Sequence, residues 1–280
     1  MELGRVARDV IGGFAAGRPA LARAAPVLLS IAVMGACIAP KGTAANPILG
    51  PGQSPTPLPQ PDYVGIGKYT KVGEATGRAT VAGVPALTVL EVRQPGNTSV
   101  PVTGGARFVY QEKGLTSLRT DDSDASRALE PGHAYFLSGE VDHVNPKNAE
   151  ALWYEIGLVP TGARGASIPG GRVAYTSPEL PTLMPGIPYT YQLGLIEMDP
   201  GGRTSSHSHG GLEVFYVLSG SVELRLAGGG RSTVATGAGA YVRPEQPMQL
   251  VVTGDQPVRI VTFFATPEGK PWQTNLQTAP

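Results

Sequence analysis

The apolar residues of this chain come in short runs, separated by glycine, proline and small polar residues. No stretch longer than about ten residues keeps a helical period, whereas short apolar runs between turn residues are typical of strands. From residue 222 to residue 226, apolar and charged side chains alternate, as in a strand with one buried face. The expected strands are Val84–Val92, Arg107–Gln111, Ala134–Leu137, Leu152–Val159, Tyr189–Met198, Glu213–Leu218, Val222–Leu226, Ala240–Val242, Met248–Val252 and Val258–Phe264. The pattern therefore predicts an all-β fold.

Composition supports this prediction. The 280 residues include 38 glycines and 27 prolines, which favour short strands and turns over helices. Charged residues make up 16%, below the roughly 25% that is typical of soluble domains. The formal net charge is +0, which gives no electrostatic basis for binding nucleic acid or an anionic membrane.

The two halves of the chain repeat one another with an offset of 106 residues. Leu87–Val92 falls on Leu193–Met198, and Ala151–Val159 falls on Pro257–Ala265 without a gap. Between Gly96 and Gly114, seven of nineteen positions are identical to their counterparts in the second half. The chain is therefore predicted to hold two tandem copies of one β domain.

The N-terminal residues differ from the rest. Four arginines between residues 5 and 23 precede Ala24–Pro40, which carries no charge. Its apolar part, Pro26–Ile38, is shorter than the roughly 20 residues of a membrane span. This order is typical of a secretory signal, which we place at residues 1–39, followed by an extended proline-rich linker at 40–62.

The only cysteine, Cys37, ends the apolar run. Val33–Cys37 resembles the lipobox of bacterial lipoproteins, in which the cysteine is lipidated. Ordinary cleavage after Ala45, which would discard Cys37, is an equal alternative. Both hypotheses imply an exported protein, either secreted or held at the cell envelope, that meets a membrane only through its N-terminus. The mature chain would have no disulfide in either case.

Residues 201–220 concentrate the candidate chemistry. His207 and His209 are two positions apart, so in a strand their side chains share a face. The pair Gly210–Gly211 can then turn the chain and return Glu213 on a neighbouring strand. Two neutral imidazoles and a carboxylate suit Mn, Fe, Ni or Zn. The alternative, that the histidines are exposed loop residues, is less favoured because the spacing is so tight.

This stretch resembles the first sequence signature of the cupin superfamily. The positions that fit every spacing are Gly201, His207, His209, Glu213 and Gly220. Of the second signature, Gly239 and Pro244 fit, but Gln249 stands where the family has a histidine. Together with the repeat, the resemblance covers about residues 86–266. It implies two tandem cupin (double-stranded β-helix or jelly-roll) barrels after a disordered N-terminal segment.

The domain boundaries follow from the repeat and the resemblance. We expect a first barrel at 63–165, a link at 166–188, a second barrel at 189–270 and a C-terminal tail at 271–280. In the first barrel, Pro101, Thr103 and Arg107 replace the two histidines and the glutamate, and arginine offers no lone pair. That barrel is therefore expected to be free of metal. Arg107 would pair with a local acid or, less favoured, hold a carboxylate ligand, and His143 would be structural or on the surface.

The second barrel is expected to hold one divalent ion, with Gln249 as a candidate fourth ligand through its amide oxygen. An amide makes the donor set harder and favours Mn or Fe, with Ni or Zn as further options. By strand alternation, Phe215, Val217 and Val251 would line a dry pocket. Tyr241 and Arg243 are candidates for groups behind the ligands, although packing or surface roles fit them at least as well.

Two hypotheses of function remain open. The first is a metal-dependent enzyme acting on a small organic molecule, because the layout is similar in outline to quercetin dioxygenases and oxalate decarboxylases, and somewhat to ureidoglycine aminohydrolase. The second is a non-catalytic module that binds a small molecule or senses it. The intact first signature favours the enzyme, and the missing fourth histidine favours the binding module. A small-molecule ligand or substrate and further copies of the chain are the partners considered; catalytic residues are not assigned.

Overall fold

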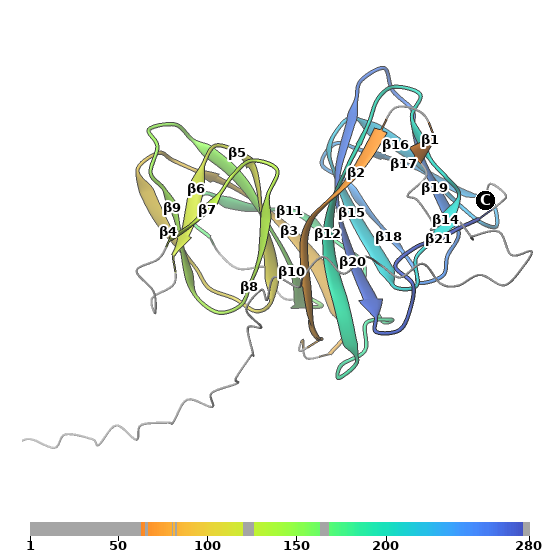
Figure 1. Cartoon of the computed structure of the whole chain (residues 1–280), viewed down its shortest axis with the longest axis horizontal. Helices are drawn as coiled ribbons and strands as arrows, with labels where there is room; N and C mark the ends of the chain where they lie inside the picture. Colours follow the sequence, from red (N-terminus) through yellow and green to blue (C-terminus); the bar gives the residue numbers. More distant parts are fainter. Residues whose placement is uncertain are drawn as a thin grey trace, which may run out of the picture. The chain divides into compact units, whose positions relative to one another are not determined.

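The structure is a computed structural model that describes residues 63–64, 67–79, 81, 83–119, 126–162 and 168–276, all within one compact unit, Thr56–Pro280. Every regular element in that part of the chain is a β-strand, so the all-β prediction is confirmed (Figure 1). Among the residues described, no helix is long and apolar enough to cross a bilayer. The predicted signal, Cys37 and the whole of the proline-rich linker lie outside the described residues and stay predictions.

The first barrel consists of two antiparallel sheets, a five-stranded sheet in the order β11-β3-β10-β5-β8 and a four-stranded sheet in the order β4-β9-β6-β7. Its strands are β3 (Pro85–Gln94), β4 (Thr98–Val102), β5 (Arg107–Lys113), β6 (Thr116–Arg119), β7 (Ser126–Leu129), β8 (Ala134–Leu137), β9 (Val141–Asn145), β10 (Ala151–Pro160) and β11 (Gly171–Thr176).

The second barrel repeats this plan. One sheet has the order β18-β15-β20-β12-β2, and the other has the path β1-β13-β19-β14-β21, with β16 joined to β19 and β17 to β16. The strands are β1 (Tyr63–Val64), β2 (Gly67–Arg78), β12 (Pro188–Met198), β13 (Arg203–Thr204), β14 (His207–Ser208), β15 (Leu212–Ser219), β16 (Ser221–Leu226), β17 (Gly230–Ala235), β18 (Gly239–Val242), β19 (Met248–Val252), β20 (Val258–Pro267) and β21 (Thr274–Asn275).

Three apolar cores hold these sheets together. The first barrel encloses side chains from both of its sheets, among them Val92, Leu118 and Trp153. The second barrel does the same with residues that include Phe215, Leu224 and Leu250. A third core joins the two barrels: Phe108 and Ile156 of the first pack in the same cluster as residues of the second such as Tyr191 and Phe263, whose ring lies 6.3 Å from that of Phe108.

All ten strands expected from the sequence are present, with ends that differ by at most a few residues. The two-barrel prediction fails in one detail, the membership of edge strands. Strand β2 pairs along its length with β12 of the second barrel, although its residues were assigned to the first. Strand β11 lies in the expected link and pairs with β3 of the first barrel. Both are edge strands whose outer faces are largely polar and exposed, so no apolar run marks them in the sequence.

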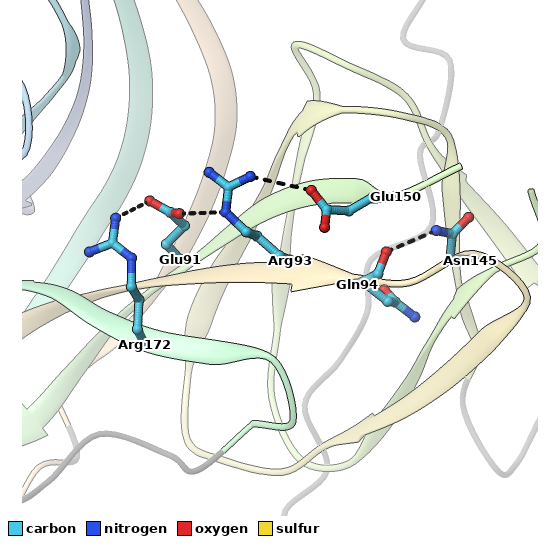
Figure 2. Close-up of polar contacts among 6 residues, drawn as sticks. All are labelled: Glu91, Arg93, Gln94, Asn145, Glu150 and Arg172. Atoms are coloured by element: carbon cyan, nitrogen blue, oxygen red, sulfur yellow. Dashed lines mark hydrogen bonds and ion pairs between the residues drawn. The ribbon is translucent and has the colours of Figure 1, made fainter. Parts of the chain in front are cut away.

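An ion-pair chain fixes strand β11 to strand β3 (Figure 2). The buried carboxylate of Glu91 contacts Arg172 of β11 at 2.6 Å and Arg93 at 3.2 Å, and Arg93 continues to Glu150. Figure 2 also shows the amide of Asn145, on the other sheet, donating to the carbonyl oxygen of Gln94 at 3.2 Å. Polar side chains thus tie both the edge strand and the opposite sheet to β3.

His143 is fully buried in the first barrel and has a structural role. Its Nε2 lies 2.6 Å from the hydroxyl of Thr116, which donates to Gln111, so Nε2 carries the proton and donates to Thr116. Its ring packs on Trp153 with centroids 4.1 Å apart. Burial lowers the pKa of His143 to about 3. The imidazole is therefore a neutral part of the core.

We expect the unfolding free energy of His143→Leu to fall less than that of wild type between pH 7 and pH 5. The unfolded chain takes up a proton on this imidazole below its ordinary pKa of 6.5, whereas the folded chain stays neutral down to about 3, so the contribution of His143 falls as pH decreases through that window. Between pH 7 and pH 5, wild type should lose about 2 kcal/mol more unfolding free energy than the variant. Urea unfolding at both pH values measures this.

The exposed His133 provides the matched control, since His133→Leu removes an imidazole from the surface. This control should keep the wild-type pH dependence. Equal pH dependence in His143→Leu and wild type would contradict the neutral, buried assignment.

Candidate metal centre

His207, His209 and Glu213 converge inside the second barrel. One potential ligand atom from each lies within 4.8 Å of the others, and the two imidazole centroids are 4.9 Å apart. All three side chains are buried, with exposures of 6%, 4% and 2%. His207 lies on β14 of one sheet and Glu213 on β15 of the other, so the group spans the two sheets.

Gly210 and Gly211 let the chain cross between these sheets. Neither has a positive φ, so the glycines are not required by a left-handed turn. A Cβ on Gly210 would lie 2.4 Å from the carbonyl oxygen of Pro271, and one on Gly211 would lie 2.1 Å from that of Ala265. The pair is needed because two other backbone segments approach the crossing closely.

Backbone carbonyls orient both imidazoles toward the group. The Nδ1 atom of His207 lies 2.8 Å from the carbonyl oxygen of Ser205, and that of His209 lies 2.8 Å from the carbonyl oxygen of Trp272. A carbonyl can only accept, so each Nδ1 carries the proton and each Nε2 keeps a free lone pair. This arrangement fixes the tautomer of metal-binding histidines in general.

Glu213 is the electrostatic centre of the site. Its Oε1 accepts a hydrogen bond of 2.8 Å from Thr262, while its buried Oε2 has no hydrogen-bond partner and lies 3.4 Å from Nε2 of His209. Burial raises the pKa of Glu213 to about 7, and burial followed by the neighbouring His207 lowers the pKa of His209 to about 3. Burial also lowers the pKa of His207. Two neutral imidazoles and a carboxylate without a counter-charge fit a divalent cation.

The structure does not bring Gln249 into this group. Its Nε2 donates to the carbonyl oxygen of Thr204 at 2.9 Å, and its Oε1 lies 3.4 Å from Nη1 of Arg225. Strand β19 turns Met248, Leu250 and Val252 into the core, so Gln249 and the half-buried Val251 belong to the other face. The expected fourth ligand and Val251 are therefore displaced by one position. The other two expected pocket residues, Phe215 and Val217, lie in the apolar core and do not line the cavity of the ligands.

A longer loop causes this displacement. Residues 138–140 join β8 to β9, whereas residues 243–247 join β18 to β19, five residues against three. The offset of 106 between the repeats therefore breaks here: Leu118 pairs with His143, while its counterpart Leu224 pairs with Leu250. Leu250 takes the place of His143 and lines the cavity as an apolar wall.

The ligands share a cavity of about 20 Å³ with residues that the sequence analysis missed. Tyr69 of β2 and Trp272 line it, with rings 5.1 Å apart. Residues 271–276 are not a free tail, because β21 pairs with β14 and places Asn275 opposite His207. Trp272, one of only two tryptophans, and the glycines at 210 and 211 were the available signals.

Two further candidates lie elsewhere. Tyr241 packs against the core between the barrels, with its hydroxyl 3.2 Å from that of Thr182. Arg243 is exposed. Both therefore have the packing and surface roles that the sequence analysis held to be at least as well supported.

In the first barrel an internal ion pair occupies the corresponding place. Arg107 stands where Glu213 stands in the second barrel, and its Nε lies 3.0 Å from Oε2 of Glu155, with both side chains buried. The remaining guanidinium nitrogens donate to the carbonyl oxygens of Val102, Gly105 and Gly139. Arg107 therefore pairs with a local acid, as the favoured prediction held.

Comparison with known proteins agrees with this architecture. Residues 194–264 match the cupin domain family. Vicilin from Solanum lycopersicum (tomato) aligns with a TM-score of 0.51 and 14% identity over 68% of this chain and 77% of that chain. Vicilin from Solanum melongena, which holds different anionic ligands in structurally similar pockets, aligns with a TM-score of 0.51 and 12% identity over 70% and 78%. An oxalate decarboxylase aligns with a TM-score of 0.50 and 13% identity over 78% and 82%. No curated protein sequence matches the chain.

Two antiparallel barrels, with a buried group of candidate metal ligands in the second, define a tandem-barrel protein. The second barrel matches a cupin domain, and the pair has the fold of solved two-barrel structures. The second barrel is therefore a cupin domain, and the two barrels together are similar in fold to bicupins. Identities of 12–14% establish the fold alone.

We expect Arg107→Met to lower the unfolding free energy by about 3–5 kcal/mol, because it leaves the buried Glu155 without its cation. The double variant Arg107→Met/Glu155→Leu should regain part of this loss, since it buries no unpaired charge. Urea unfolding of the single and double variants measures the coupling. Lys71→Met, which breaks an exposed pair with Glu74, is the control and should cost less than about 1 kcal/mol. A double variant no more stable than Arg107→Met would contradict the ion-pair account.

Proposed function

We propose that this bicupin is exported, either secreted or anchored at the cell envelope, and that its second barrel binds one divalent transition metal ion. His207, His209 and Glu213 would hold the ion. The proposal is carried by one observation: three buried ligand atoms lie within 4.8 Å of one another, and one of them, Oε2 of Glu213, has no hydrogen-bond partner. Export rests only on the sequence pattern of the first 40 residues.

The donor set favours iron or manganese. Two histidines and one carboxylate with positions left open are typical of non-haem iron oxygenases, although nickel and zinc also accept this set. The harder amide ligand on which the sequence argument relied is absent from the group, so the preference now rests on the open positions. A bound ion would supply Lewis acidity or redox chemistry.

We propose further that the centre is catalytic and acts on a small organic molecule, in a dioxygenase-like or aminohydrolase-like reaction. The protein would contribute fixed imidazole tautomers, a buried carboxylate and a small cavity beside them. The aromatic wall formed by Tyr69, Phe264 and Trp272 supports this role, because it keeps the surroundings of the ligands dry.

One observation favours a second candidate, a non-catalytic binding module. The cavity measures about 20 Å³, whereas a single water already needs about 10–15 Å³ of such space. An ion would leave little room for an organic substrate unless a wall moves. In that case the metal would serve stability or the binding of a very small ligand.

We expect purified protein to bind about one Mn(II), Fe(II) or Zn(II) per chain and to lose the ion in His207→Ala/His209→Ala. Mass spectrometry of the metal content after desalting measures the stoichiometry. At a free ion concentration of about 100 times Kd, binding should add about 2.7 kcal/mol of stability, which a chelator removes. Gln249→Ala should keep the ion, since its amide is bonded to Thr204. Retention of the metal by the double histidine variant would remove the site assignment.

Turnover separates the two candidates. Metal-loaded protein should consume oxygen or release product with some member of a panel of small phenols, carboxylates and amides. The metal-free protein and the double histidine variant should not. Stoichiometric metal without turnover on any member of the panel would favour the binding module.

A further inference from the structure

Three buried polar atoms in the metal cavity have no hydrogen-bond partner. They are the hydroxyl of Tyr69, Nε1 of Trp272 and Oε2 of Glu213, and all three residues line the same cavity as the two histidines. They come from β2, from the segment before β21 and from β15. A bound cation would give Glu213 a partner. The donors of Tyr69 and Trp272 would still lack acceptors, and a buried donor without an acceptor is unfavourable.

The position of Tyr69 is built into the fold. Strand pairing sets Tyr69 opposite Ile196, and Ile196 lines the cavity as well. A Cβ on Gly194 would lie 2.3 Å from Cε2 of Tyr69, so glycine leaves the space that the ring occupies. The ring packs against Trp272 at 5.1 Å and edge-on to Phe264 at 6.5 Å. Packing thus holds the hydroxyl in the cavity wall without any hydrogen bond.

Charge and size define what the two donors would accept. A divalent ion with two neutral imidazoles and one carboxylate leaves a net charge of +1 in a buried site, and buried sites favour neutrality. The missing partner would then be an acceptor with one negative charge. The cavity of about 20 Å³ restricts it to a few atoms.

We propose that Tyr69 and Trp272 form an anion-recognition pair, which donates two hydrogen bonds to a small monovalent anion that enters the cavity beside the metal ion. Small carboxylates and inorganic anions of similar size share this chemistry. The inference rests on the proposed metal site and narrows its ligand class. It also gives strand β2, which precedes the first barrel in sequence, a direct role in the site of the second barrel.

Anion titration of the full chain loaded with Co(II) tests the pair. The visible absorption of the cobalt reports azide, formate and benzoate in separate titrations. Azide and formate should bind to wild type, and benzoate should not fit. Tyr69→Phe and Trp272→Phe should each weaken binding by about 10- to 100-fold, the value of a hydrogen bond to a charged group. Both variants keep an aromatic ring, and Trp272→Phe keeps the carbonyl that orients His209.

Tyr191→Phe is the matched control, because it removes a tyrosine hydroxyl from the core between the barrels. It should bind azide as wild type does. Cobalt content is measured for every protein, and the Phe variants should keep about one ion per chain. Binding of azide without formate would restrict the ligands of the site to inorganic anions. Binding of both would extend the ligand class to small carboxylates. Either result supports the pair.

Cobalt-loaded Tyr69→Phe and Trp272→Phe that bind azide as tightly as wild type would overturn this inference and leave the metal site standing. Wild type that takes up no cobalt would overturn both. Loss of cobalt from Tyr69→Phe would also contradict the pair, because it would make the phenol a metal ligand. If Trp272→Phe does not fold, Tyr69→Phe alone decides, since it keeps the ring carbons that pack over Gly194.

Discussion

The second barrel depends on a carboxylate that the chain itself does not neutralise. Glu213 lies in the interior with an exposure of 2%, and among the residues that the structure describes, the only hydrogen bond to it comes from the hydroxyl of Thr262. A buried charge without a partner is among the most costly features a fold can carry. The two imidazoles beside it are neutral and offer lone pairs, so they cannot supply the missing positive charge. A bound cation would neutralise this carboxylate; without one, burial raises the pKa of Glu213 to about 7, so that it can take up a proton instead.

The first barrel meets the same constraint in another way. Arg107 occupies the position of Glu213, and Glu155 is opposite Val109 where Thr262 is opposite Phe215. The first barrel thus supplies both the positive charge of Arg107 and the negative charge of Glu155. The guanidinium also donates hydrogen bonds to three backbone carbonyl oxygens. The first copy of the repeat has an ion pair in its interior, and the second has a group of candidate metal ligands at the corresponding place. This contrast explains why a single metal centre is expected in a protein with two barrels.

Much of the fold could be predicted from the sequence, because buried strands such as β12 and β20 are rich in aliphatic and aromatic residues. The group of His207, His209 and Glu213 was also predictable, since it depends on short spacings within one segment. Strand β2 was not, because its partner β12 lies more than 100 residues away and its own residues are mostly polar. Gln249 was misplaced for a different reason: after the longer loop, strand β19 is shifted by one residue against the repeat offset of 106, which reverses the side chains that face inward, and an ungapped repeat cannot reveal this shift.

The same long-range pairing means that the two barrels are not independent units. Strand β2 precedes the first barrel in sequence but pairs with β12 of the second, and the space at Gly73 is closed by the ring of Phe108 from the first. Tyr69, four residues earlier, reaches the metal cavity. The first barrel therefore contributes to the candidate metal centre of the second, because it packs against the strand that carries Tyr69. Loss of that packing would be felt at the candidate centre even if the first barrel binds no ion.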